Sequence, residues 1–165
     1  MVFAAQGGVA RLVSMLSAPE GMPQSLINRG APAEMANWPA DPMAIQARQA
    51  PPEINEKQRR VLYPSVSIYC DKIENRQTEK YRRFSGTLRY VIEVRVAGDR
   101  LETLQDELHL QTEAVLDTLE RNRGDLGDGL FWSGAYEVTF GAVKHGGPNY
   151  LQTAKVICEL TLSRE

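Results

Sequence analysis

The stretch "SGTLRYVIEVRVAGDRLETLQDELHLQTEAVLDTLERNR", from Ser85 to Arg123, decides the expected fold because it changes from a strand pattern to a helix pattern at one glycine. Between Leu88 and Val96, apolar and polar residues alternate, which is typical of a half-buried β-strand. After Gly98, apolar residues recur at helical spacing, at Leu101, Leu104, Leu108, Val115 and Leu119. We therefore expect a strand, with its polar face in water at Arg89, Glu93 and Arg95, followed by a long helix.

Both ends of this helix carry residues that favour a helix terminus. Asp99 follows Gly98 and can cap the first turn, and Glu102 lies three residues later, as in a capping box. At the other end, Arg121 and Arg123 suit the helix dipole, and Gly124 accepts the left-handed backbone of a C-terminal cap.

Three other segments alternate like strands: "VLYPSVSIYCDKIE" (61–74), "GAYEVTFGAVK" (134–144) and "YLQTAKVICELTLS" (150–163). Their expected inward residues are Val66, Ile68 and Cys70, then Tyr136, Val138, Phe140 and Ala142, and finally Ala154, Val156, Cys158, Leu160 and Leu162. The order strand, strand, helix, strand, strand predicts an α+β domain. We expect an antiparallel sheet of about four strands with one long helix packed on a face, plus a short N-terminal helix and a Pro-rich arm.

The chain divides into three expected parts. Residues 1–18 include a short helical pattern, and residues 61–165 form the α+β core domain. Residues 19–60 hold seven of the nine prolines, which remove backbone donors and oppose a sheet or a long helix. We interpret 19–60 as an extended arm that is either disordered or laid against another chain. Its apolar residues occur singly, as Met22, Leu26, Met35, Trp38 and Met43, and Trp38 and the methionines favour the second alternative.

The length, composition and net charge of the chain fit an ordinary soluble domain. The 165 residues leave room for a hydrophobic core, and 42% are apolar. A net charge of −2 gives no overall electrostatic footprint for nucleic acid. No export signal or membrane-spanning run is recognised, which predicts synthesis in a reducing cytoplasm with Cys70 and Cys158 as free thiols.

No residue set predicts catalysis, a metal site or a cofactor site. The two histidines are His109, on the helix, and His145, in a glycine turn. Cys70 and Cys158 occupy inward strand positions, where a buried thiol is usual. Phosphate-loop, nucleophile-elbow and zinc-helix motifs are absent from the sequence. Acidic residues on the helix are interpreted as a solvated face, at Glu102, Asp106 and Glu113.

The segment "RGDLGDG", residues 123–129, resembles an adhesion tripeptide and a metal loop. Adhesion requires export, and a calcium loop requires more oxygen ligands at a fixed spacing with a final Glu. We therefore interpret Asp125 and Asp128 as residues of an acidic turn between the helix and the next strand.

The segment "DKIENRQTEKYRRFSG", residues 71–86, is longer than a tight hairpin requires and mixes basic with aromatic residues. Three interpretations stay open: contact with a nucleic-acid backbone, contact with a protein, and a solvated hairpin extension. Together with the arm, the segment supplies the candidate interface residues, namely Trp38, Arg76, Lys80, Tyr81, Arg82, Arg83 and Phe84.

The layout from Val61 to Glu165 resembles the tail terminator and tail-completion (neck) proteins of long-tailed bacteriophages. The matching segments are "PSVSIYCDKIE", "TLRYVIEVRVAG", "RLETLQDELHLQTEAVLDTLERN", "YEVTFGAVKHGG" and "LQTAKVICELTLS". The Pro-rich arm departs from the compact members of that family.

This resemblance implies a structural virion protein without catalytic residues or cofactors. Such a protein assembles in the host cytoplasm into a hexameric ring, caps the tail tube and joins it to a head-connector or stopper protein. DNA then passes through the lumen without specific binding, and no membrane is involved. The alternative function is a nucleic-acid-binding module that uses the basic loop 71–86.

Overall fold

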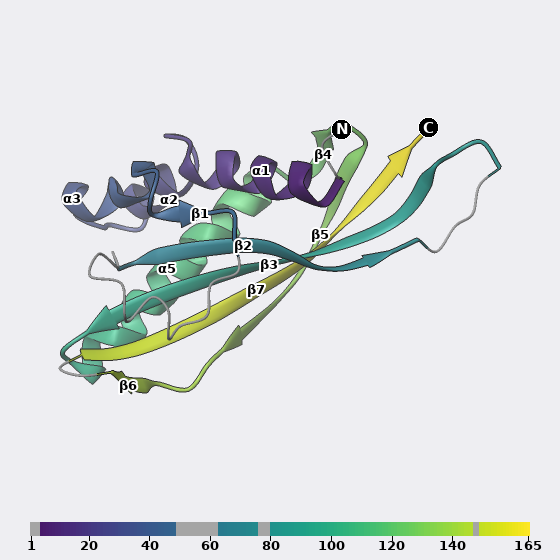
Figure 1. Cartoon of the computed structure of the whole chain (residues 1–165). Coiled ribbons are helices and arrows are strands. Elements are labelled where there is room, and N and C mark those ends of the chain that lie inside the picture. The colour runs from purple at the N-terminus through teal and green to yellow at the C-terminus, as the bar shows by residue number, and fades with distance from the viewer. Residues whose placement is uncertain (1–3, 49–62, 76–79, 147–148) are drawn as a thin grey trace.

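A computed structural model of the chain describes residues 4–48, 63–75, 80–146 and 149–165 (Figure 1). The helical elements are α1 (Ala4–Ser17), α2 (Met22–Asn28), α3 (Ala33–Ala36), the 3-10 helix η1 (Trp38–Ala40) and α5 (Leu101–Arg121). The strands are β1 (Ile45–Gln46), β2 (Ser65–Glu74), β3 (Phe84–Gly98), β4 (Gly124–Gly127), β5 (Leu130–Phe140), β6 (Lys144–Gly146) and β7 (Asn149–Arg164).

The expected fold class is wrong, because in the described part of the chain the sheet is mixed and has seven strands in place of about four antiparallel ones. Its order is β1-β2-β3-β7-β5-β4, with β6 paired to β7 outside this path. β1 runs parallel to β2, and the remaining pairs are antiparallel. The missed strands are β1, β4 and β6, which have two to four residues each and so cannot show a clear alternation.

β3 and β7 form the centre of the sheet. Their register runs from Phe84 opposite Arg164 to Gly98 opposite Tyr150. Along this pair, the expected inward residues are buried on one face, namely Leu88, Tyr90, Ile92, Val94 and Val96 of β3 and Ala154, Val156, Cys158, Leu160 and Leu162 of β7. The alternation in the sequence therefore identified the core face of both long strands correctly.

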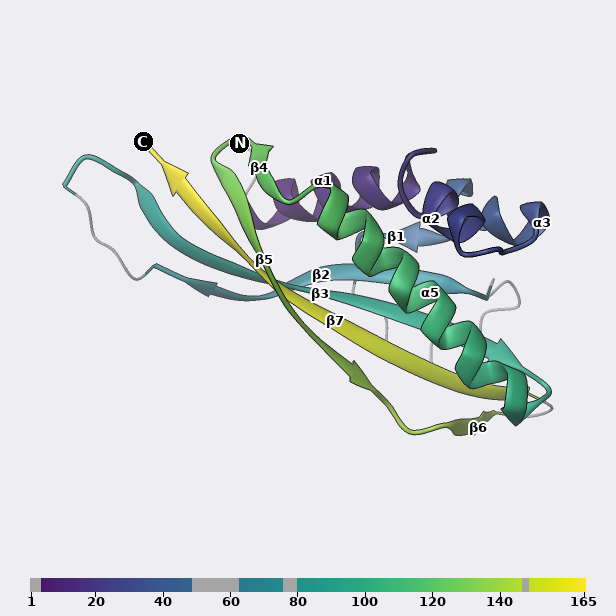
Figure 2. The same cartoon turned by 180° about the vertical axis from the view of Figure 1, so that it is seen from behind.

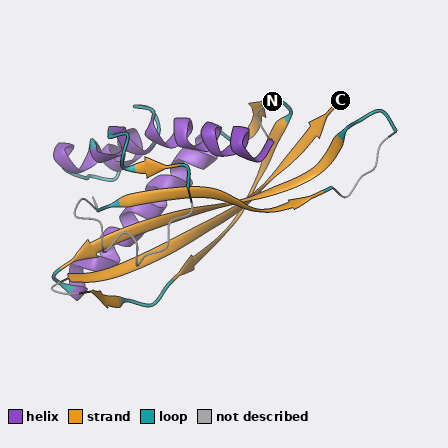
Figure 3. Cartoon of the chain, viewed as in Figure 1, coloured by secondary structure: helices purple, strands orange, loops and turns teal. Residues whose placement is uncertain are grey.

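Helices cover this core face. Leu104, Leu108 and Val115 of α5 join the hydrophobic core with the inward residues of β3 and β7. Leu12 and Leu16 place α1 in the same core, and Figure 2 shows the sheet from the side of α5. Figure 3 shows that the helices end before the strands do, so β2 and β3 continue past them at one end of the molecule.

Residues 19–48 are not an extended arm, contrary to the expectation. Met22 and Leu26 of α2 are fully buried in the chain's own core, and Ile45 of β1 is buried beside β2. Prolines are compatible with this because Pro23 and Pro39 lie in the first turn of α2 and η1, where a helix does not use the backbone N–H. The rest of the expected arm, residues 49–60, lies outside the described residues.

Three local expectations also need correction. α5 begins after Arg100, and no side-chain hydrogen bond caps it, so the Asp99–Glu102 capping box is wrong. Leu101 is 50% exposed rather than part of the buried stripe. The sheet face opposite the helices is not uniformly wet, since Glu93 and Arg95 are only 5% and 2% exposed.

Candidate functional site

The hairpin between β2 and β3 carries most of the predicted interface residues. Lys80, Arg82 and Arg83 are exposed, and Tyr81 is 85% exposed, with the Lys80 ammonium 6.0 Å from its ring centroid. Phe84 is half-buried against the core at the base of the hairpin. Arg76 lies outside the described residues. We call Lys80–Arg83 the hairpin arm.

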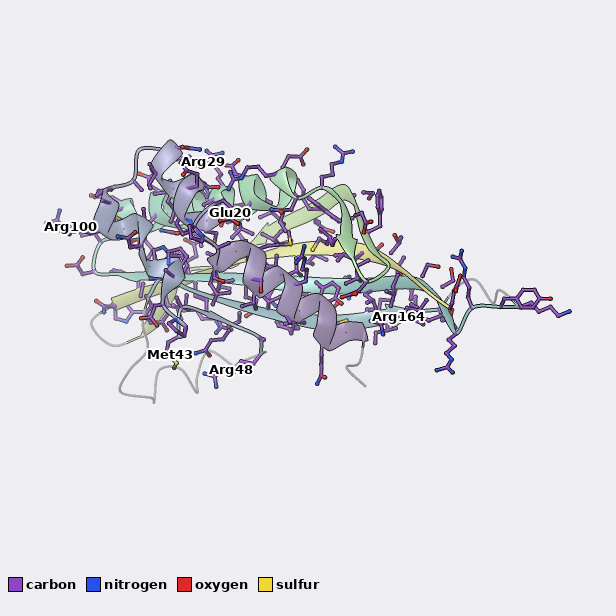
Figure 4. All side chains as sticks on the ribbon, turned by 90° about the horizontal axis from the view of Figure 1, so that it is seen from above. Glu20, Arg29, Met43, Arg48, Arg100 and Arg164 are labelled. Atoms are coloured by element: carbon purple, nitrogen blue, oxygen red, sulfur yellow. The ribbon has the colours of Figure 1, made fainter. Side chains whose placement is uncertain are left out.

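The register of the sheet explains why the hairpin arm projects. Arg164 ends β7 opposite Phe84, so Lys80–Arg83 lie beyond the last strand pair. In Figure 4, Arg164 lies on the side of the molecule from which the hairpin extends, whereas Arg29 and Arg100 lie toward the opposite end. At the base, Gly86 allows close approach of the two strands, because a Cβ there would lie 1.9 Å from the Glu74 carbonyl oxygen.

Trp38 lies apart from the hairpin arm. It begins η1, is half-buried against the core, and donates its indole N–H to the Gln111 Oε1 of α5 at 3.1 Å. The structure therefore does not bring Trp38 together with the other predicted interface residues. Its indole fixes the N-terminal segment on α5, which is a role within the fold.

The hairpin neutralises part of its own positive charge. The Arg89 guanidinium binds the Asp71 carboxylate through two hydrogen bonds of 2.8 and 2.9 Å, and Lys72 pairs with Glu74. Arg82 donates to the Ser163 hydroxyl. Lys80 and Arg83 have no carboxylate partner in the described ranges. The charge offered outward is thus concentrated on the hairpin arm.

A second surface, which sequence reasoning missed, lies on β5 at the opposite edge of the sheet. β4 pairs with β5 only at Leu130, Phe131 and Trp132. A register shift leaves residues 133–135 without partners on β7, and the pairing resumes at Tyr136. From Tyr136 to Phe140, β5 pairs with β7 on one side, and no strand among the described ranges pairs with its other side. We call this stretch the open β5 edge.

The open β5 edge exposes two aromatic rings. Tyr136 and Phe140 are each 49% exposed, although both were expected to be inward. They lie on the core face of the sheet, opposite Cys158 and Ala154, and Phe140 contacts the His109 ring at a centroid distance of 4.9 Å. Alternation identified the face correctly but could not show that this strand lies at an edge, because strand order depends on non-local pairing.

Glu93 and Arg95 of β3 form a buried ion pair at 2.5 Å on the face opposite the helices. Glu93 also accepts a hydrogen bond of 2.7 Å from the Tyr69 hydroxyl, and the Lys155 ammonium lies 3.6 Å away. Burial, together with the adjacent Glu93 carboxylate, raises the pKa of Tyr69. These contacts make a fixed polar network within the sheet rather than an exposed ionisable site.

The thiols and imidazoles that were considered for catalysis do not meet one another. The His145 and Tyr150 rings pack in a T-shaped arrangement, and His109 contacts Phe140. Burial raises the pKa of Cys158 to about 12 and also raises that of Cys70, which disfavours the thiolate at both positions. Within the described part of the chain, no three His, Cys, Asp or Glu side chains gather as metal ligands.

The "RGDLGDG" segment forms β4 and the turn to β5. The Asp125 carboxylate accepts the Gly127 N–H at 2.8 Å, and Asp128 and Gly129 have positive φ angles of 54° and 80°. These backbone conformations belong to a tight turn between antiparallel strands. Gly124 does have a positive φ, of 109°, but it begins β4, and the helix cap is Asn122.

No family model matches the chain, and a search of curated proteins gives no match. None of the helices in the described ranges is long and apolar enough to cross a membrane.

Proposed function

We propose that this chain is a structural virion protein, a tail terminator or neck ring subunit of a long-tailed bacteriophage. In this role it forms a hexameric ring that caps the tail tube and joins it to a head-connector or stopper protein. DNA passes through the lumen without specific binding, and no catalytic step, cofactor or membrane takes part. The layout of the strands and of α5 motivates the proposal.

One observation supports the proposal: the sheet has two unlike exposed features at opposite edges. The projecting hairpin lies on the β2 side, and the open β5 edge lies at the other end of the strand order. A closed ring of identical subunits needs two unlike surfaces that complement each other in a head-to-tail contact. A subunit with a projecting hairpin and an open strand edge meets this requirement.

The test is assembly with and without a tail tube. The purified chain is analysed by light scattering over a range of concentrations and by negative-stain imaging. It is then mixed with tubes of the tail-tube protein encoded near its gene. We expect rings of defined size, either free or at one end of the tubes. A chain that remains monomeric and never localises to a tube end contradicts the proposal.

A further inference from the structure

The backbone of the open β5 edge is arranged to accept another strand. The Gly141 N–H donates to the Thr153 carbonyl of β7 at 2.8 Å. Because hydrogen-bonded and non-hydrogen-bonded pairs alternate in an antiparallel ladder, Thr139 and Glu137 also direct their backbone groups toward β7. Tyr136, Val138 and Phe140 therefore direct their N–H and C=O groups away from β7, to the side where no described strand pairs with them.

The two edges of the sheet differ in how they are protected against pairing. At the β2 edge, β1 covers Val66 and Ser67, and a register shift follows between Cys70 and Lys72 in a charged segment. β5 also has a register shift, between Trp132 and Tyr136, but beyond it the open β5 edge from Tyr136 to Phe140 is regularly paired with β7, Glu137 is its only charge, and it has no proline or lysine. Proteins often block an exposed edge with charged residues, proline or bulges, so the stretch from Tyr136 to Phe140 is left open to pairing with another strand.

The charges of the two surfaces are complementary. Lys80–Arg83 has three basic residues and no acidic one. β4, its turn and β5, residues 124–140, have three acidic residues and no basic one, namely Asp125, Asp128 and Glu137. The Arg123 side chain lies against Gly134 of β5, where it pairs with Glu120. The aromatic groups match as well, because Tyr81 projects from the hairpin arm and Tyr136 and Phe140 lie half-exposed on the core face of the open β5 edge.

We propose that the hairpin arm of one copy docks on the open β5 edge of the next copy. Tyr81 packs against Tyr136 and Phe140, while Lys80 and Arg83 face Glu137 and the acidic turn at Asp125 and Asp128. The contact is head-to-tail, because its two halves lie at opposite edges of the sheet. This proposal specifies the contact between subunits of the proposed ring, and it therefore rests on the proposed function.

Charge reversal tests the contact directly. Arg83→Glu and Glu137→Lys should each reduce assembly at least tenfold, as measured by light scattering at moderate salt. An equimolar mixture of the two variants should restore assembly, because each hairpin arm then meets an oppositely charged β5 edge in an alternating ring. Matched controls are Arg11→Glu on α1 and Glu34→Lys on α3, two exposed charge reversals that should leave assembly unchanged.

Different results separate this contact from the alternatives. If Glu137→Lys alone reduces assembly and Arg83→Glu has no effect, the β5 edge pairs with its own copy, and the proposed contact is wrong. If neither variant changes rings that form on tail tubes, the contact is also wrong, but the proposed function stands. If the wild-type chain self-associates but forms no closed ring and binds no tube, and the mixture restores this self-association after each variant has reduced it, the contact stands and the proposed function fails.

Cross-linking of the unaltered chain gives an independent readout. A mixture of ¹⁴N- and ¹⁵N-labelled protein is treated with a carbodiimide, which joins a lysine amine to a nearby carboxylate without a spacer. We expect peptides that link Lys80 to Glu137, Asp125 or Asp128 and combine one light with one heavy partner. Lys80 links found only within one isotope, or only to other carboxylates, overturn the proposal.

Discussion

The indole N–H of Trp38 donates to the side-chain oxygen of Gln111 at 3.1 Å, so a residue of the proline-rich segment is bonded to the long helix α5. Gln111 is fully buried, and the neighbouring α2 contributes Met22 and Leu26 to the same core. The N-terminal segment, as far as it is described, is thus part of the folded body, and its stability depends on contacts with α5.

Replacing Trp38 should therefore destabilise the whole fold. Trp38→Ala removes the packed ring and leaves the Gln111 oxygen without its donor, which should lower the free energy of unfolding by about 2–4 kcal/mol. Trp38→Phe keeps most of the packing and should cost only about 1 kcal/mol. Urea denaturation compares the two variants. Equal stability of Trp38→Ala and the wild type would contradict the packing role.

The buried Glu93–Arg95 pair should be costly to break on one side. Arg95→Met leaves the Glu93 carboxylate buried without the guanidinium, and we expect a loss of about 3–5 kcal/mol in unfolding free energy. Arg89→Met is the matched control on the same face of β3, because its pair with Asp71 is solvent-exposed and should contribute far less to stability than the buried pair. Similar losses in both variants would show that burial does not set the cost.

Glycine at position 86 should be required for close packing of the hairpin base. In Gly86→Ala the new Cβ meets the Glu74 carbonyl backbone, so β2 and β3 must separate, at a cost of about 1–3 kcal/mol. Gly98→Ala is the control on the same strand, since its nearest neighbour is the Leu104 Cδ1 at 3.7 Å, an ordinary contact. Its stability should change by less than about 0.5 kcal/mol. Urea denaturation measures both variants, and hydrogen exchange at Leu88 should rise only in Gly86→Ala.

The raised pKa of Cys158 predicts a loss of stability at high pH. The folded pKa of about 12 lies above the reference value of 9.0, so the unfolded chain releases the proton first as the pH rises. The stabilisation of the folded state by the protonated Cys158 thiol is fully present below about pH 9. It is lost between pH 9 and pH 12, and the free energy of unfolding falls by up to about 1.4 kcal/mol per pH unit.

Cys158→Ala tests this assignment. The variant should show a flatter decline in urea midpoint between pH 9 and pH 10 than the wild type. Burial also raises the pKa of Tyr69 and Tyr90, so some decline should remain in the variant. Parallel declines in the two proteins would mean that Cys158 ionises no later in the folded state than in the unfolded chain.

The spacing of apolar residues predicted the long strands and the long helix, because these elements are long enough to show a clear period. The alternation from Leu88 to Val96 placed the core face of β3, and helical spacing located α5 to within a few residues. In contrast, α2 and η1 were missed because prolines were interpreted as breakers, whereas Pro23 and Pro39 stand at first-turn positions. Whether a proline breaks or begins a helix depends on where the neighbouring residues pack.

Of the two candidate surfaces, the sequence predicted one and missed the other. The sequence marked the hairpin arm, since its length and its basic and aromatic residues are visible locally. It did not mark the open β5 edge, because Tyr136 and Phe140 alternate like core residues and become half-exposed only where no further strand pairs with β5. The burial of Glu93 and Arg95 was missed for a related reason, because the sequence shows only their polarity.

By itself, the sequence determined which face of each long strand is apolar, where the long helix lies and where positive charge gathers. These properties follow from the period of the side chains along a single segment. Only the tertiary structure decided the strand order, the parallel β1, the edge position of β5 and the packing of the N-terminal helices. Those properties depend on which distant segments pair, and pairing is set by burial of the whole core and by satisfaction of backbone hydrogen bonds across it.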